Sequence, residues 1–230
     1  MAHVNSDNHP LDRPAWHALM EKHMDIAIKG ELSARYPPEY SVIATTIDSS
    51  EEAFKDLAKI VNKGEVIGLI AKRPAKDSPE WKELRESTVI QMTIDERLPV
   101  KGLDIVELEI KDIPDVVGLV EATKPGPFAK RTVELGRYIG IRSEEKLVAM
   151  AGERFRMNGY SEISAVCVLP EYRGKGYAKE LSSILVNAIL DQGDIPYLHV
   201  SPLNTAAVAL YEKLGFTKRR DVPGWVMMRV

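Results

Sequence analysis

The amino-acid sequence predicts an α/β protein in which a mixed central sheet is flanked by helices. Two observations lead to this class. Strand-like and helix-like segments alternate along the 230 residues, which favours helices packed on a sheet. The segments 137–143 and 146–156 both resemble strands and are joined by a short polar turn, which indicates a hairpin. Because a hairpin pairs its strands antiparallel, an all-parallel doubly wound sheet is not expected.

The first half of the chain is expected to form a smaller α/β region. Asp12 and Pro14 stand where a helix could begin, since proline is common at the first helical position. A short amphipathic helix is expected after Ser50, because two acidic residues and a helical apolar spacing follow it. Strands are expected at 41–47, 65–72 and 87–95. The segment LPVKG, 98–102, separates this region, residues 1–102, from a second one, residues 103–230.

The second region has clearer elements. Asp112 is a candidate cap for a helix with proline in its first turn. Gly215 stands where a glycine commonly closes a helix. The expected strands are 104–110, 137–143, 146–156, 160–169, 197–201 and two closing strands after Phe216, and the expected helices are 176–190 and 204–214.

Composition narrows the function classes. The apolar fraction of 44% suffices for a core, and a net charge of −3 argues against a nucleic-acid or membrane-surface partner. Cys167 is the only cysteine, so no internal disulfide forms and a reducing, cytoplasmic location fits. We see no signal peptide and no apolar run near the roughly 18–20 residues of a spanning helix. A monomer or a homodimer is expected.

The stretch VLPEYRGKGYAKEL, 168–181, has the features of a phosphate loop. It joins a predicted strand to a predicted helix, and the free N–H groups at a helix N-terminus attract phosphate. Glycine lets the backbone approach such an anion closely. A Walker A loop is excluded because no serine or threonine follows Lys175, and a Rossmann loop is excluded because Lys179 replaces the third glycine.

A second motif identifies the phosphate. The loop contains RGKGYA, which resembles the pyrophosphate loop of the GNAT superfamily of acyl-CoA-dependent N-acyltransferases. The later stretch NTAAVALYEKLGF resembles the second motif of that superfamily at Asn204, Ala207, Tyr211, Gly215 and Phe216. The resemblance covers about residues 105–230 and is strongest to a bacterial branch whose members mostly lack an assigned substrate.

The resemblance implies how acetyl-CoA would bind. The pyrophosphate would lie on the backbone amides of residues 173–178, and the pantetheine arm along the edge of residues 166–168, where this strand separates from its neighbour. Tyr211 would protonate the departing thiolate as a general acid. The residues implied to bind the cofactor are Val166, Cys167, Val168, Arg173, Gly174, Lys175, Gly176, Tyr177, Ala178, Asn204, Ala207 and Tyr211.

The sequence offers two candidates for the general base. Glu162 is the favoured candidate, because it precedes Arg173 by eleven residues, the interval of the catalytic glutamate in the histone acetyltransferase branch of the superfamily that this chain resembles. On a regular strand it would share a face with Ser164, Val166 and Val168, while a solvated strand-end glutamate is the alternative. Glu153 is the second candidate base. Cys167 is interpreted as a packed residue rather than a nucleophile.

The resemblance implies an N-acetyltransferase acting on a primary amine of a small molecule or amino-acid-like acceptor. A non-catalytic acyl-CoA sensor and a protein N-acetyltransferase are the alternatives. No metal is expected, because the five histidines lack metal-ligand spacing, and His199 is interpreted as structural. Residues 1–102 are interpreted as a degenerate second copy of the fold, or else as a lid or substrate-binding extension. The loop 123–132 should lie near the acceptor, with Phe128, Arg131 and Thr132 as contacts.

Overall fold

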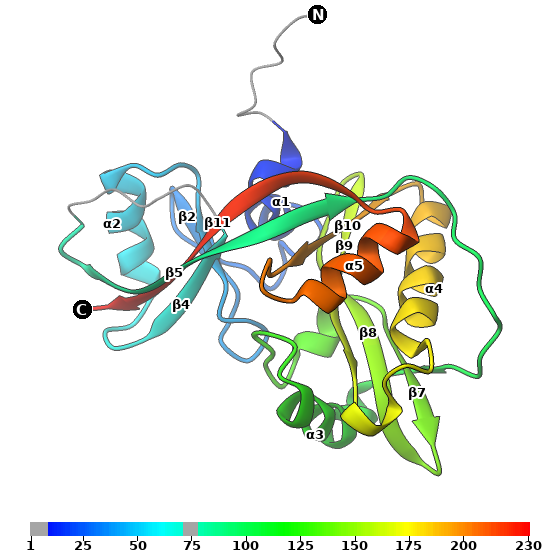
Figure 1. Cartoon of the computed structure of the whole chain (residues 1–230). Helices are drawn as coiled ribbons and strands as arrows, with labels where there is room; N and C mark the ends of the chain where they lie inside the picture. Colours follow the sequence, from blue (N-terminus) through cyan, green and yellow to red (C-terminus); the bar gives the residue numbers. More distant parts are fainter. Residues whose placement is uncertain (1–8, 71–77) are drawn as a thin grey trace, which may run out of the picture. The chain divides into compact units, whose positions relative to one another are not determined.

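The computed structural model describes residues 9–70 and 78–230, which form two compact units along the chain (Figure 1). The first unit consists of the residues up to Pro37 together with Val42–Thr88 and Val222–Val230. The second consists of Pro38–Ser41 and Val89–Asp221. Two long strands, β5 (Trp81–Thr93) and β11 (Thr217–Arg229), contribute residues to both units.

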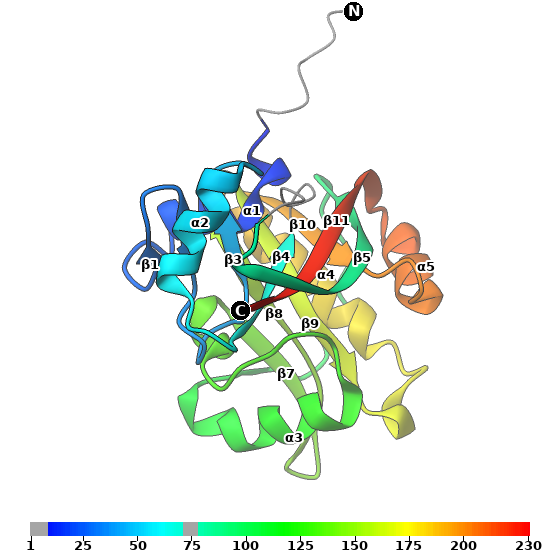
Figure 2. The same cartoon turned by 90° about the vertical axis from the view of Figure 1, so that its left-hand side faces the viewer.

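The first unit has a three-stranded antiparallel sheet and two helices, seen from a second side in Figure 2. Its elements are η2 (Pro10–Asp12), α1 (Pro14–Met20), β1 (Ile28–Lys29), β2 (Ser33–Arg35), β3 (Ala44–Thr46), α2 (Glu51–Ile60) and β4 (Val66–Ile70). The β4 strand pairs antiparallel with the last part of β11. Phe54, Leu57 and Trp225 belong to the apolar core of this unit.

The helix predicted after Ser50 is confirmed as α2, and Ser50 caps it. The Ser50 hydroxyl accepts a hydrogen bond from the backbone N–H of Ala53 at 3.2 Å. Glu51 and Glu52 lie in the first turn, where a negative charge is favoured by the helix dipole. Of the predicted strand 65–72, residues 66–70 form β4, and residues 71 and 72 lie outside the described residues.

The second unit contains a mixed sheet in the order β5-β10-β9-β8-β7-β6, with β11 beside β5. The β9 and β10 strands are parallel, whereas β10 with β5, β9 with β8, β8 with β7, and β7 with β6 pair antiparallel. Figure 1 shows β8 between α3 and α4, so helices flank the sheet. The remaining elements are β6 (Val106–Glu107), η3 (Ile110–Asp112), α3 (Ile113–Thr123), η4 (Thr132–Leu135), β7 (Tyr138–Ser143), β8 (Lys146–Met157), β9 (Tyr160–Val168), η5 (Pro170–Tyr172), α4 (Tyr177–Asp191), β10 (Ile195–Val200) and α5 (Thr205–Leu214).

The predicted fold class is confirmed, including the hairpin of β7 and β8. Glu144 and Glu145 occupy its turn with φ angles of 49° and 67°. Two element predictions were wrong. The strand expected at 104–110 ends at Glu107, because Glu109 and Asp112 form a reciprocal capping box that begins η3. The two expected closing strands are one long strand, β11.

The predicted boundary between residues 102 and 103 differs from the division into units. Val89–Thr93 belongs to the second unit, where β5 pairs with β10. Val222–Val230 returns to the first unit, where it pairs with β4. Such pairing joins segments that are far apart in the sequence, and no local pattern signals it. The two interpretations of residues 1–102, a degenerate copy or an extension, remain predictions.

Gly152 allows a tyrosine ring to lie flat against the centre of the sheet. Tyr138 of β7 pairs with Gly152 of β8, and a Cβ atom at Gly152 would overlap the Tyr138 ring. Gly152→Ala is therefore expected to lower the free energy of unfolding by about 1–3 kcal/mol, the usual cost of overpacking a core. Chemical denaturation measures this effect.

Gly118→Ala is the matched control for Gly152→Ala. Gly118 is exposed on α3 and has no atom within 4 Å of an added Cβ. Alanine favours the helix over glycine there by up to about 1 kcal/mol. Equal unfolding free energies for Gly152→Ala and the wild type would contradict the placement of the Tyr138 ring.

Candidate active site

A bulge in β9 determines which side chains face the candidate site. Ser164 is paired with Gly152, but Cys167 is paired with Met150, so β9 has one residue more than β8 in this interval. Ala165 lies in the interval with φ at 53°, a left-handed conformation that is unusual for alanine. The extra residue places Cys167 on the same face of the sheet as Ser164.

The alternation expected from the sequence is therefore wrong beyond Ser164. Val168 pairs with Ala149 and lies on the face opposite Glu162. Cys167, which a regular strand would turn away, instead shares the face of Glu162. We call this the acceptor face of the sheet. It also carries Gly152 and the ring of Tyr138, because Tyr138, Gly152 and Ser164 lie opposite one another on three adjacent strands.

The β9 and β10 strands separate beyond Glu162. Their parallel pairing covers Tyr160–Glu162 against Ile195–Tyr197 and, among the described residues, extends no further. From Leu198 to Val200, β10 remains paired with β5, while β9 remains paired with β8. The edge of β9 that faces β10 is therefore open over the predicted cofactor residues Val166–Val168, as the resemblance implied.

The predicted phosphate loop follows this open edge. Gly174 and Gly176 have φ angles of 77° and 86°, and an added Cβ would meet no atom within 4 Å at either position. Glycine is thus favoured by the backbone conformation rather than by lack of space. Arg173–Gly176 is exposed, and Gly176 caps the N-terminus of α4. Lys175 Nζ lies 4.6 Å from the centre of the Tyr172 ring.

A buried carboxylate in the first turn of α4 is hydrogen-bonded by backbone amides. Glu180 Oε1 accepts hydrogen bonds from the N–H groups of Lys101 at 2.7 Å and Gly102 at 2.8 Å. An uncompensated negative charge here would repel a bound phosphate. The segment 98–103, predicted only as a joint, therefore lies against α4, and its backbone amides stabilise the negative charge of Glu180.

The second motif forms α5 as predicted. The Asn204 side chain accepts a hydrogen bond from the Ala207 N–H at 3.2 Å, so this asparagine caps the helix. Gly215 closes the helix with φ at 99°. Tyr211 is 7% exposed and packs edge-on against Phe216. Burial, with a smaller contribution from Cys167, raises the pKa of Tyr211 to about 12.

Cys167 lies close to Tyr211 and is a neutral thiol. Burial raises the pKa of Cys167 to about 11, although interactions with Thr123 and the backbone of Met150 oppose this. A thiolate, not a thiol, is the effective nucleophile. The structure therefore favours the interpretation of Cys167 as a packed residue. Thr123 ends α3, so the end of this helix reaches the acceptor face.

Glu162 is held in a buried ion pair. Its oxygens accept hydrogen bonds from Arg154 Nη2 at 2.8 Å and Arg154 Nε at 2.9 Å. His199 Nδ1 lies 2.8 Å from Glu162 Oε1. Burial acts to raise the pKa of Glu162, but the charge of Arg154 and the hydrogen bonds from His199 and Arg154 lower it to about 2. Such a carboxylate is a poor proton acceptor at neutral pH.

The pair continues as a row of polar side chains across the sheet. Arg154, Glu162, His199, Gln91 and Arg219 come from β8, β9, β10, β5 and β11 in that order. Gln91 Nε2 lies 3.0 Å from His199 Nε2, and Arg219 Nη1 donates to Gln91 Oε1 at 2.8 Å. His199 therefore links Glu162, through Nδ1, to Gln91, through Nε2.

Sequence reasoning missed Arg154 and underestimated His199. A regular hairpin in the register of Met157 with Tyr160 would pair Arg154 with Ile163. A register shift between Glu153 and Arg156 brings Arg154 to the face of Glu162 instead, and no spacing in the sequence indicates that shift. The link from His199 to Gln91 could not be inferred, because Gln91 lies 108 positions earlier in the chain.

Glu153, the second candidate base, lies away from Glu162. It pairs with Ile163, so its side chain leaves the sheet on the face opposite Glu162 and Cys167. Glu153 Oε2 accepts a hydrogen bond from Ser161 Oγ at 3.0 Å, and burial raises the pKa of Glu153. The two carboxylates predicted from the sequence are therefore not brought together.

The loop 123–132 lies partly against the acceptor face. The Phe128 ring packs edge-on against Tyr138, with 6.0 Å between ring centres. Arg131 instead forms an ion pair with Glu134 and lies over the ring of Tyr40. Thr132 is buried and donates to the Tyr40 carbonyl at 2.7 Å. Of the three residues predicted as acceptor contacts, Phe128 is thus the one placed beside the acceptor face.

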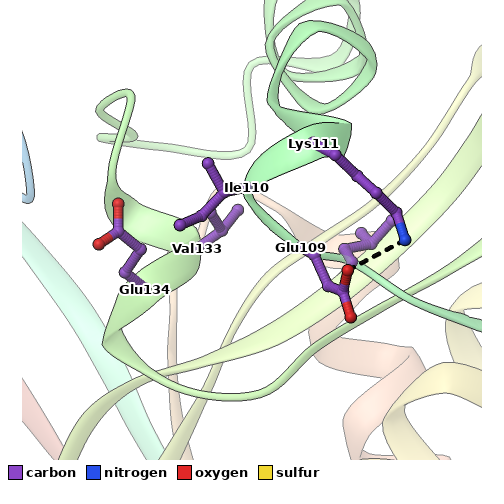
Figure 3. A pocket seen from close by; sticks show the side chains of 6 residues that line it. Glu109, Ile110, Lys111, Val133 and Glu134 are labelled. Atoms are coloured by element: carbon purple, nitrogen blue, oxygen red, sulfur yellow. Dashed lines mark ion pairs between the residues drawn. The ribbon is translucent and has the colours of Figure 1, made fainter.

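A separate hollow of about 420 Å³ lies at the other edge of the sheet. Its lining residues are Leu108, Glu109, Ile110, Lys111, Val133 and Glu134. Figure 3 shows Ile110 and Val133 together in its middle, with the Glu109–Lys111 ion pair on one side and Glu134 on the other. None of the site residues predicted from the sequence lines this hollow.

No helix in residues 9–70 or 78–230 is long and apolar enough to span a membrane. Over the same residues, no group of three or more histidine, cysteine, aspartate or glutamate side chains is arranged to hold a metal ion.

Comparisons with known proteins agree with this architecture. A family model described as FR47-like protein matches residues 138–226. The chain is similar to the crystal structure of a GNAT-family protein from Novosphingobium aromaticivorans, with 33% identity, a TM-score of 0.89 and coverage of 97% of this chain and 100% of that one. A comparison with curated proteins finds no significant match.

More distant solved structures share the fold. A GCN5-related N-acetyltransferase from Kribbella flavida is 11% identical, with a TM-score of 0.59 and coverage of 94% of this chain and 92% of that one. A GCN5-related N-acetyltransferase-like protein from Streptococcus suis is 18% identical, with a TM-score of 0.53 and coverage of 87% and 81%.

Proposed function

The chain belongs to the GNAT family of acetyltransferases, and from this we propose that it transfers an acetyl group from acetyl-CoA to a primary amine. The acceptor in this proposal is a small molecule or an amino-acid-like compound. The observation that carries the proposal is the open edge of β9, which has the phosphate loop at its end and Cys167 and Tyr211 beside it.

The loop suits the pyrophosphate of coenzyme A. Free N–H groups at the start of α4, two glycines with positive φ and the exposed Arg173 and Lys175 together form an anion site. The backbone edge of Val166–Val168 that is not paired with β10 offers hydrogen bonds to the amides of the pantetheine arm. Asn204 is already engaged as a helix cap, so its contribution is to position α5.

The chemistry is a direct attack. The neutral amine nitrogen forms a bond to the thioester carbonyl carbon, and the carbon–sulfur bond then breaks. A backbone N–H of the open β9 edge stabilises the negative charge on the carbonyl oxygen. Tyr211 gives its proton to the departing sulfur, and solvent restores that proton. This route requires no metal and no covalent intermediate on the protein.

The contacts of Glu162 favour a different role from the base predicted from the sequence. Both oxygens are bound by Arg154, and one also by His199. We therefore assign Glu162 a structural role, in which its ion pair stabilises the acceptor face. In this scheme the proton that the amine loses is accepted by water. Glu153 takes no part in this scheme, since it lies on the other face of the sheet.

The cofactor site is tested by placing a negative charge in the loop. Gly176→Glu would put a carboxylate where the pyrophosphate binds, so the dissociation constant for CoA is expected to rise about tenfold or more. Isothermal titration calorimetry with CoA measures it. The amine reaction is tested separately, by the release of free thiol from acetyl-CoA when primary amines are added.

Gly193→Glu is the matched control for Gly176→Glu. Gly193 has φ at 80°, and an added Cβ there meets no atom within 4 Å, so the backbone strain and the added charge are equivalent. It lies beyond the other end of α4. Unchanged CoA affinity in Gly176→Glu, or an equal loss in both variants, would rule out this placement of the pyrophosphate.

A further inference from the structure

The hydroxyl of Tyr138 is a buried polar group that the proposed chemistry has not yet used. Tyr138 is 2% exposed, and its Oη atom has no hydrogen-bond partner among the described residues. Most buried polar side-chain atoms in proteins have a partner, and leaving one without is costly. A bound ligand that hydrogen-bonds to this hydroxyl would supply the missing partner.

The ring of Tyr138 is held in one position. Gly152 provides the space beneath it, and the edge of the Phe128 ring packs against it. Tyr138, Gly152 and Ser164 lie in one line across β7, β8 and β9, so the phenol extends along the acceptor face. A group fixed in this way can orient a substrate without first losing its own freedom.

The hydroxyl of Tyr138 lies near charged and polar side chains of the candidate site. Burial raises the pKa of Tyr138, and Arg154, Glu162 and Cys167 are close enough to act on it as well. The hydroxyl thus stays neutral and can accept a hydrogen bond. Arg154 and Glu162 already satisfy each other, and Cys167 lies beside the predicted path of the pantetheine arm.

We propose that Tyr138 Oη accepts a hydrogen bond from the attacking amine of the acceptor and orients its lone pair toward the thioester carbonyl. This inference rests on the proposed acetyl transfer. Phe128 is half-buried on the loop 123–132 and packs against the Tyr138 ring, so this proposal requires its side chain to turn aside when the acceptor binds. Tyr138 is a positioning residue for the amine and takes no proton from it.

Tyr138→Phe tests the proposal because it keeps the ring and removes only the hydroxyl. With acetyl-CoA saturating, kcat/KM for the amine is expected to fall about tenfold, mainly through a higher KM for the amine. The KM for acetyl-CoA and the dissociation constant for CoA should not change. An unchanged kcat/KM for the amine would overturn the proposal while leaving the proposed function intact.

A second readout does not depend on activity. In the free protein Tyr138→Phe should melt at the same temperature as the wild type or higher, because no hydrogen bond is lost. Tyr197→Phe is the matched control, since Tyr197 is also fully buried but donates to the Phe155 carbonyl at 3.2 Å, and it should melt lower. A clear decrease for Tyr138→Phe would show that its hydroxyl has an internal partner, which also overturns the proposal.

The two proposals fail in different ways. If the wild type binds CoA but acetylates no amine, the proposed function fails, and the role of Tyr138 fails with it. If the wild type acetylates amines and Tyr138→Phe does so with equal kcat/KM, only the role of Tyr138 fails.

Discussion

Replacing Glu162 by glutamine is expected to lower the free energy of unfolding by about 3–5 kcal/mol. Glutamine has the size of glutamate but no charge, so the guanidinium of Arg154 would be left buried without its counter-ion. The Arg154 side chain is 12% exposed and that of Glu162 is 1% exposed, so water can do little to compensate. Urea denaturation of both proteins at neutral pH measures the difference.

The ion pair also predicts how stability depends on pH. The pKa of Glu162 is about 2 in the folded protein, below its usual value of 4.5. The unfolded chain therefore binds a proton at higher pH than the folded chain. The contribution of Glu162 is fully present above pH 4.5 and is lost as the pH falls through about 2. The Glu162→Gln variant should lack this part of the acid dependence.

Glu107→Gln is the control for the loss of an ion pair as such. Glu107 pairs with Arg137, but the Glu107 side chain is 53% exposed, so its loss should cost less than about 1 kcal/mol. If Glu162→Gln were as stable as the wild type while its turnover collapsed, Glu162 would act as the base, and our reassignment would be incorrect.

Replacing Tyr211 by phenylalanine is expected to lower kcat by about a hundredfold or more, the usual range for removal of a general acid. The change keeps the ring that packs against Phe216 and removes only the donor to the departing sulfur. The dissociation constant for CoA should therefore stay the same. Steady-state kinetics at saturating acetyl-CoA, with calorimetry for CoA binding, separates the two effects.

The raised pKa of Tyr211 sets the pH range of this effect. Because the pKa is about 12, the phenol keeps its proton through pH 10, and Tyr211 should cause no alkaline loss of kcat below that value. Tyr160→Phe, a half-buried tyrosine at the start of β9, should keep the wild-type kcat. A Tyr211→Phe variant with undiminished kcat would exclude Tyr211 as the general acid.

The parts of the fold predicted correctly are those with local signals. The acidic first turn and apolar spacing of α2, the turn at Glu144 and Glu145, and the closing glycine of α5 are each signalled within a few residues. The place of β5 beside β10 could not be predicted, because a strand carries no mark of a partner about 100 residues away. The same limitation explains why β11 was predicted as two strands and why the two compact units do not follow the predicted boundary.

In the candidate active site, too, the features with local sequence signals were predicted and those without them were not. The phosphate loop and the second motif were identified because glycine spacing and helix capping are visible in the sequence. The bulge in β9 was missed because Ala165 adopts its left-handed backbone without the glycine that usually signals one. That one residue decides that Cys167, rather than Val166 or Val168, shares the face of Glu162. The Tyr138 hydroxyl, which has no hydrogen-bond partner among the described residues, could not be predicted either, because its position depends on packing across three strands.

Acetyl transfer to an amine at this site is tested most directly by the release of free thiol from acetyl-CoA. The assay uses the full chain and a panel of small amines, amino acids, aminoglycosides and peptides. We expect at least one amine to raise thiol release well above the rate without amine, with an acetylated product of matching amount, and we expect Gly176→Glu and Tyr211→Phe to suppress it. Binding of CoA by the wild type with no amine-dependent thiol release across the panel would contradict the proposal and favour a non-catalytic acyl-CoA sensor.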